Sequence, residues 1–152
     1  MKKLLLVAAV FCVHLAFAQE SGQEKIYRTT EVDSKPDLKE GMYTLMMFVS
    51  DNFKYPEIKN KKVIVFTSFI IEPDGKMTDK KAFYVSAKDL ISSDVVKIQT
   101  EEEKAADAKA FESMKTEAAR VLAMFDKTWI PATVGGKPVR CLYNYPINFN
   151  IE

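Results

Sequence analysis

The chain has 152 residues, 47% of them hydrophobic and 28% charged, a balance that suits a single domain with a buried core. The formal charge of +1 at pH 7 is nearly neutral, which argues against nucleic acid or an acidic membrane surface as a partner. Two cysteines and one histidine leave few side chains for nucleophilic or metal chemistry.

The first eighteen residues are predicted to be a cleavable secretory signal. Lys2 and Lys3 precede the apolar run Leu4–Phe17, and Ala16 and Ala18 provide the small side chains that signal peptidase requires. A helix of that run spans about 21 Å, less than the roughly 30 Å of a membrane's hydrocarbon core. We therefore expect export, with an uncleaved inner-membrane anchor as the alternative.

Cleavage would also remove Cys12 and His14, which leaves Cys141 as the one thiol and no histidine. An internal disulfide, a histidine-dependent triad and a histidine-ligated zinc site would then be impossible. Aspartate and glutamate remain plentiful enough for a hydrolase that uses two carboxylates, although their spacing in the sequence identifies no candidate catalytic pair. Loss of the two lysines changes the formal charge to −1. We predict a protein that is not an enzyme and uses no cofactor or metal.

The polar, aperiodic residues 19–33 predict a flexible arm that leads to a domain over residues 34–152. Ser34–Asp37 has the chemistry of a helix start, and apolar residues then recur every three or four positions. The pattern predicts a helix from about Leu38 to Asn52, weakened at Gly41. Its methionines, at positions 42, 46 and 47, are expected in the core, with an adaptable groove as the alternative.

Two strands and a turn are predicted next. Val63–Ile71 is rich in β-branched and aromatic residues on both faces, which indicates a strand buried on both sides. Glu72–Lys76 has the proline and glycine of a hairpin turn. Met77–Ser86 is expected to return as an antiparallel strand.

The second half of the chain predicts a long helix and a third strand. Thr100 and Glu103 form a capping box, so a helix should run from there to about Asp126, with the charges of Glu101–Lys115 facing water. Trp129–Ala132 is predicted to be extended, and Gly135-Gly136 to be a turn. We expect Trp129 itself to be a core residue.

Val139–Ile151 has the clearest alternation of apolar and polar residues and predicts the third strand. Cys141 falls on its apolar face and is expected in the core. Pro146 has no N–H for a central ladder, so at least the second half of this strand should lie at a sheet edge. The predicted fold is α+β, a three-stranded antiparallel sheet with two helices packed on one face.

Six short motifs, in this order and at these spacings, resemble the C-terminal domain of TonB, the periplasmic part of an energy transducer, particularly the form common in Bacteroidetes-type bacteria. The resemblance extends from about Tyr55 to Ile151. The motifs are Tyr55-Pro56, Phe69–Lys76, Ala118–Val121, Trp129–Pro131, Gly136–Val139 and Tyr145–Phe149.

The resemblance implies a periplasmic domain that binds the TonB box of an outer-membrane transporter, or a segment of another envelope protein, as an added strand beside the third strand. The candidate peptide-binding residues combine the Tyr-Pro motif with the polar face of the predicted edge: Tyr55, Pro56, Asn144, Pro146, Asn148 and Asn150. The same polar edge could instead serve to prevent strand pairing.

Two features depart from the family. TonB transducers have an uncleaved anchor and a long proline-rich spacer, whereas this chain has a cleavable-looking signal and a short arm. Residues 87–113 also resemble an insertion that lengthens the helix. Three alternatives therefore stay open: a module that dimerises through its sheet edge, a module that associates with the cell wall, and a full transducer whose first eighteen residues stay as an anchor.

Overall fold

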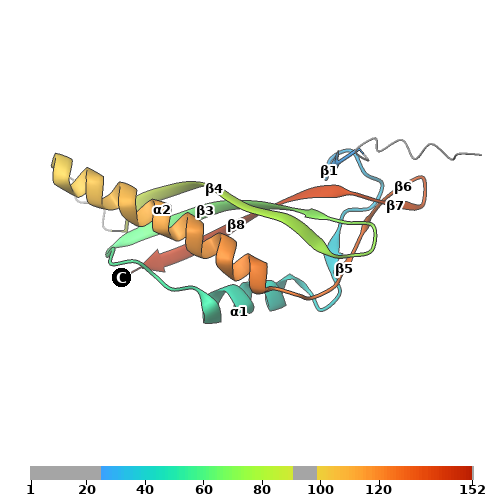
Figure 1. Cartoon of the computed structure of the whole chain (residues 1–152), viewed down its shortest axis with the longest axis horizontal. Coiled ribbons are helices and arrows are strands. Elements are labelled where there is room, and N and C mark those ends of the chain that lie inside the picture. The colour runs from blue at the N-terminus through green and yellow to red at the C-terminus, as the bar shows by residue number, and fades with distance from the viewer. Residues whose placement is uncertain (1–24, 91–98, 152) are drawn as a thin grey trace, which may run out of the picture.

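The structure is a computed structural model that describes residues 25–90 and 99–151. It is an α+β fold in which two helices lie against one face of a curled, mixed sheet (Figure 1). The predicted signal, residues 1–18, lies outside the described residues. The elements in chain order are β1 (Tyr27–Arg28), β2 (Asp37–Leu38), α1 (Met42–Asn52), β3 (Lys61–Ile71), β4 (Met77–Asp89), α2 (Glu101–Met124), β5 (Trp129–Ile130), β6 (Ala132–Val134), β7 (Lys137–Val139) and β8 (Cys141–Ile151).

The main sheet has four strands in the order β1-β8-β3-β4. The central strand β3 pairs antiparallel with β4 on one side and with β8 on the other, as predicted for the three long strands. The prediction of a purely antiparallel three-stranded sheet is wrong, because β1 joins β8 in parallel at Cys141 and Leu142. A strand of two residues is too short to show a period of two, so no sequence pattern predicts β1.

The described part of the predicted arm, residues 25–33, is held against the domain. Besides β1, the backbone N–H of Asp33 donates to the carbonyl of Thr133 at 2.8 Å, and the Asp33 carboxylate accepts from the N–H of Gly135 at 2.6 Å. The flexible arm predicted for residues 19–33 therefore needs correction over this stretch. Its polar residues bond to the β6–β7 hairpin, a contact that composition does not reveal.

Helix α1 begins four residues later than predicted. Gly41, at the N-cap, has a φ of 83°, which interrupts a helix at that point. Leu38 lies instead in β2 and pairs with Trp129 of β5. The Ser34 hydroxyl lies 2.6 Å from that of Thr133 and caps no helix.

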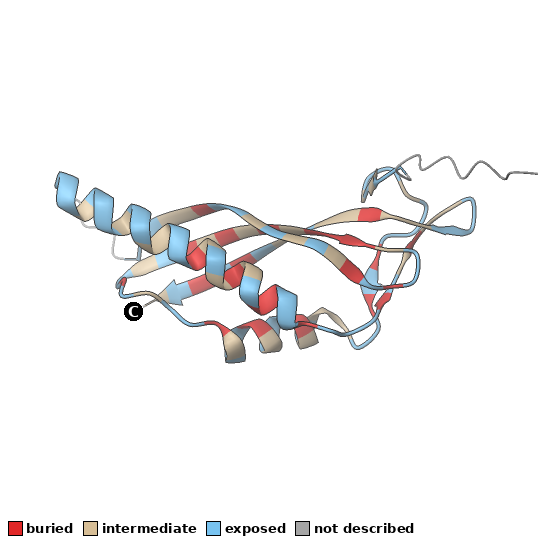
Figure 2. Ribbon diagram, in the orientation of Figure 1, coloured by how far each residue is buried: buried red, intermediate tan, exposed pale blue. Residues whose placement is uncertain are grey.

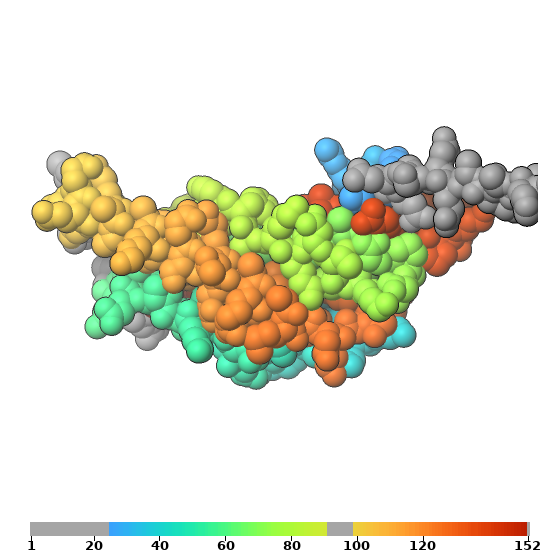
Figure 3. Space-filling model, viewed as in Figure 1, coloured from blue at the N-terminus to red at the C-terminus, as the bar shows by residue number. Residues whose placement is uncertain are grey.

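The core lies between the helices and the sheet, where the buried segments face one another (Figure 2). Trp129 is 1% exposed and Cys141 is fully buried, which confirms both predicted core placements. The apolar residues of α1, α2 and β3 that complete it include Leu45, Val49, Met114, Ala118, Val121, Leu122, Val63 and Val65. In Figure 3, α2 packs directly beside α1 and over β4, so that it covers this face of the sheet.

The second helix and its capping box are confirmed. The Thr100 hydroxyl accepts from the N–H of Glu103, and the Glu103 carboxylate accepts from the N–H of Thr100. Glu101, Glu102 and Lys104 are exposed, as predicted for the charges of Glu101–Lys115, whereas Asp107 is partly buried and pairs with Lys61 of β3 at 3.1 Å. The first turns of α2 extend beyond the sheet (Figure 1), and of the predicted insertion, residues 91–98 lie outside the described residues.

Two strands differ in length from their predictions. The strand predicted to end at Ser86 continues to Asp89, and the strand predicted from Val139 is divided at Arg140. Val139 belongs to β7, which forms a hairpin with β6 around the predicted Gly135-Gly136 turn. The Arg140 guanidinium contacts Glu72, with Nε 2.8 Å and Nη2 3.0 Å from the two carboxylate oxygens.

Candidate functional site

The free edge of β8 is the feature that could accept another strand. On the side opposite β3, this strand pairs with β1 at Cys141 and Leu142 alone. From Tyr143 to Ile151 no strand in the described part of the chain covers that side. The expected sheet edge in the second half of the third strand is therefore confirmed.

Pro146 shows which way the backbone groups of this edge point. The pairing with β3 continues through Pro146 opposite Phe66, although proline has no N–H to donate. Pro146 must occupy a position of the antiparallel ladder whose backbone groups point away from β3. The same direction follows for every second residue, so the N–H and C=O groups of Asn144, Asn148 and Asn150 also face outward.

The opposite edge of the sheet is less suited to strand addition. Strand β4 contains five charged residues, and its pairing with β3 shifts register twice through bulges. Charges and bulges are the usual protection of an edge strand. Strand β8 has neither: it contains no charged residue, and its pairing with β3 runs without a shift.

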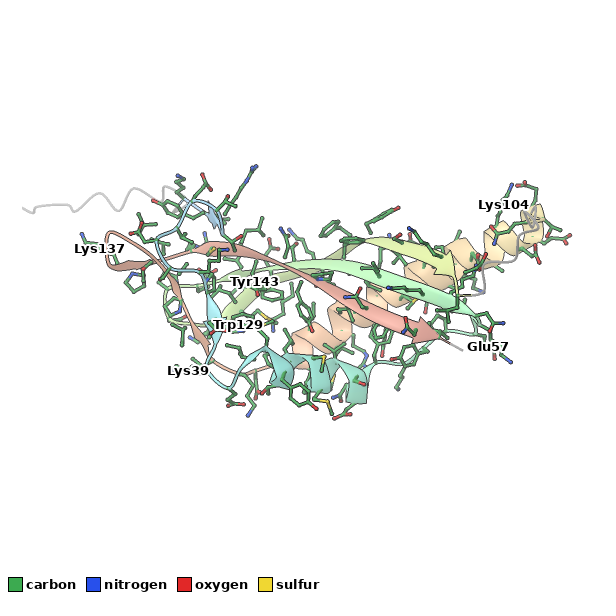
Figure 4. All side chains as sticks on the ribbon, turned by 180° about the vertical axis from the view of Figure 1, so that it is seen from behind. Lys39, Glu57, Lys104, Trp129, Lys137 and Tyr143 are labelled. Atoms are coloured by element: carbon green, nitrogen blue, oxygen red, sulfur yellow. The ribbon has the colours of Figure 1, made fainter. Side chains whose placement is uncertain are left out.

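Helix α1 and β8 border a groove of about 450 Å³. In Figure 4, seen from behind, β8 is the long strand nearest to α1, and Glu57 lies beyond its C-terminal end. The lining is uncharged: Met46, Met47, Val49, Ser50, Tyr55 and Tyr145–Asn150. A second, more open hollow shares Tyr55 and Asn150 with the groove and is otherwise lined by Pro56–Lys59 and Ile151.

Aromatic rings fix the wall of the groove near its end. The Tyr55 ring lies 5.3 Å from Phe53 and 5.1 Å from Phe149, and the last two rings are 4.5 Å apart. Tyr55 is nevertheless 48% exposed. Partial burial raises the pKa of Tyr55 above its ordinary value, so that its hydroxyl stays protonated and can donate a hydrogen bond at neutral pH.

The C-terminal end of α1 is also anchored to α2. The Arg120 guanidinium donates to the carbonyl of Asn52 at 2.8 Å, and the Glu117 carboxylate accepts from the N–H of Lys54 at 2.9 Å. Arg120 and Glu117 pair with each other as well, at 2.6 Å. These contacts hold one wall of the groove in place. Binding therefore costs less conformational entropy, because this wall is already ordered before a segment binds.

Five of the six predicted residues lie together. Tyr55, Pro146, Asn148 and Asn150 line the groove, and Pro56 lines the adjoining hollow. Asn144 is outside both. It is exposed on the same edge of β8, nearer to β1.

The sequence-based prediction missed the methionines of the groove. Met46 is 49% exposed and Met47 39%, so the expected core placement is wrong for both; only Met42 packs against the core. Leu45 and Val49 are four residues apart and occupy the buried face of α1. Met46 and Met47 follow Leu45 directly and must therefore turn away from that face, which is a signal that the sequence did contain.

The described residues show little that resembles a catalytic or membrane-spanning arrangement. Among them, no three histidine, cysteine, aspartate or glutamate side chains are grouped as a metal site. Burial, with a smaller contribution from Glu31, raises the pKa of the Cys141 thiol and keeps it protonated. No helix in these ranges is both long and apolar enough to cross a membrane.

Comparison of the chain with protein-family models, curated proteins and solved structures found no match. The resemblance to TonB C-terminal domains therefore stays a prediction that rests on the motifs between Tyr55 and Ile151.

Proposed function

We propose that this domain binds an extended segment of another protein by adding it as a strand beside β8. The observation that carries the proposal is the uncharged edge from Tyr143 to Ile151, whose outward N–H and C=O groups have no strand partner among the described residues. Main-chain hydrogen bonds would supply affinity, each contributing about 0.5–1.5 kcal/mol, and the groove beside α1 would supply selectivity.

The resemblance to TonB suggests where the bound segment comes from. It favours a periplasmic protein whose partner is the TonB box of an outer-membrane transporter or a segment of another envelope protein. Strand addition needs no cofactor, metal or catalytic group, in keeping with a binding protein that is not an enzyme.

Site-directed crosslinking tests the proposal. Asn148→Cys places an accessible thiol on the β8 edge, while the buried Cys141 reacts slowly. Lys88→Cys places a matched thiol on the β4 edge. After labelling with a benzophenone maleimide in the protein's own cell envelope, we expect a discrete crosslinked partner from position 148 and none from position 88. Equal crosslinking from both positions, or none from position 148, would contradict the proposal.

The same experiment separates the alternatives. A product of twice the subunit mass from position 148 indicates dimerisation through β8, and sedimentation of the purified domain then measures its strength. Attachment to cell-wall material indicates a cell-wall module. Finding Met1 at the N-terminus of the protein in the inner-membrane fraction would favour a full transducer, whereas Gln19 in the soluble periplasmic fraction favours a freestanding domain.

A further inference from the structure

We infer that the segment bound beside β8 alternates apolar and polar side chains. The apolar side chains face α1, and no charged side chain lies on that face. This inference rests on the proposed function and names the class of peptide that the site would accept. Side chains of a strand added to a sheet point alternately to its two faces. The two faces beside β8 differ, so the two sets of peptide side chains would meet different surroundings.

The face toward the helices offers apolar contacts. Met46 and Met47 expose 49% and 39% of their surface beside β8, and Tyr55 exposes 48%. Tyr145, Ile147 and Phe149 point to the same side of β8 and form the floor of the groove. Methionine side chains adapt to irregular partners, so this wall suits apolar residues of more than one shape.

A charged peptide side chain would be unfavourable on that face. None of the residues that line the groove between α1 and β8 carries a charge. A lysine or glutamate buried there would lose water without gaining an ionic partner from the lining. The groove therefore favours apolar side chains of the bound peptide and disfavours charged ones.

The opposite face offers polar contacts and solvent. Asn144, Asn148 and Asn150 are exposed, and they alternate along β8 with the residues of the groove floor, so their side chains point away from that floor. Asn148 and Asn150 also border the groove at the free edge of β8. The side-chain amide of Asn148 donates to the carbonyl of Pro146 at 3.2 Å, and this amide could turn to a bound segment instead. Peptide side chains on this face would remain in contact with water, so polar residues are favoured at these positions.

Strand β1 sets the length of the segment. It already occupies the position beside Cys141 and Leu142, in parallel, which shows that this edge of β8 pairs with a strand from elsewhere in the chain. An added strand would lie between Arg28 and the hollow lined by Pro56 and Ile151. Paired residue by residue with Tyr143–Ile151, the segment has roughly seven to nine residues.

A pair of synthetic peptides tests the inference. The first alternates isoleucine or tyrosine with serine or threonine over about nine residues, with two lysines added at one end for solubility. The second has the same composition but groups its apolar residues. Fluorescence anisotropy of each labelled peptide measures its Kd for the domain. We expect the alternating peptide to bind about tenfold more tightly, because it alone can bury its apolar side chains on one face.

Two variants assign the effect to the groove. Met46→Gln should weaken binding of the alternating peptide about tenfold by removing apolar contact area. Tyr43→Gln is the matched control, since Tyr43 is 67% exposed on the same helix, α1, and outside the groove. It should leave the Kd unchanged. Thermal unfolding of both variants verifies that they fold equally well.

The outcomes distinguish the inference from the function on which it rests. Equal binding of the two peptides, lost in both cases in Asn148→Pro, would overturn the alternation but leave strand addition in place. Binding of the alternating peptide that Met46→Gln does not weaken would overturn the role of the groove. If neither peptide binds, the inference is wrong, and crosslinking from position 148 decides the proposed function separately.

Discussion

At the scale of single residues, Gly75 is the described glycine at which a side chain would have least room. Its φ is 82°, and a Cβ added there would lie 2.3 Å from the backbone carbonyl oxygen of Trp129. The N–H of Trp129 also donates to the Gly75 carbonyl at 2.9 Å. We expect Gly75→Ala to destabilise the fold by about 2–4 kcal/mol, measured by denaturant unfolding, because strain and a backbone clash act together.

Gly136 is the matched control for this prediction. Its φ is 75°, but a Cβ there would meet no atom within 4 Å. Gly136→Ala should therefore cost only about 1 kcal/mol, the strain of a positive φ alone. Equal losses for the two variants would show that contact with Trp129 is unimportant.

Single residues could be predicted from the sequence where one pattern decided their environment. Cys141 alternates with apolar neighbours along a strand, and its burial followed from that alternation. The core placement predicted for Met46 and Met47 is wrong, because apolar character alone does not give the direction of a side chain on a helix. Their exposure follows from the direction of Leu45 on the same helix, and it creates the wall of the candidate site.

At the scale of elements, the Glu72–Arg140 ion pair joins the end of β3 to the start of β8. The hydrogen bonds from Arg140 lower the pKa of the Glu72 carboxyl below its ordinary value of 4.5, although burial acts in the opposite direction. We expect Glu72→Gln to lower the free energy of unfolding at pH 7 by about 2 kcal/mol. Because the pKa of Glu72 is lower in the folded state than in the unfolded state, the ionised carboxylate stabilises the fold at pH values above 4.5. The difference in unfolding free energy between variant and wild type should therefore shrink as the pH falls below 4.5.

Asp74→Asn provides the control for that measurement. Asp74 pairs with Lys76 at 2.8 Å on the exposed turn of the same hairpin, where solvent screens the pair. We expect this variant to unfold at nearly the same denaturant concentration as wild type at pH 7. A loss from Glu72→Gln that is the same at pH 7 and pH 3 would contradict the account of the ion pair.

The long elements and the extended stretch from Trp129 were predictable, whereas β1 and β2 were not. Strands β3 and β4, their turn and helix α2 follow from periodicity, β-branched residues and a capping box, which act within each segment. Strands β1 and β2 have two residues each and form only because β8 and β5 lie beside them. The predicted start of α1 is wrong because Gly41, with a φ of 83°, sets the N-terminus of the helix, and the helix-start pattern of Ser34–Asp37 caps no helix.

At the scale of the whole molecule, the two borders of the main sheet differ. The β4 border is charged, bulged and packed against α2, whereas the β8 border is uncharged, continuous and flanked by an apolar groove. The sequence indicated this edge through one residue, Pro146. It did not reveal the groove, because the wall comes from α1, about a hundred residues earlier in the chain.

Strand addition through the backbone of β8 is tested most directly by two substitutions at one residue. Asn148→Pro removes an outward N–H without touching the ladder with β3, and Asn148→Ala removes the side chain but keeps that N–H. A crosslinkable Asn144→Cys on the same edge reports partner capture in the native envelope. We predict that the proline variant loses the crosslinked partner and the alanine variant retains it, with equal thermal stability. Loss in both, or retention in both, would contradict binding through the backbone of β8.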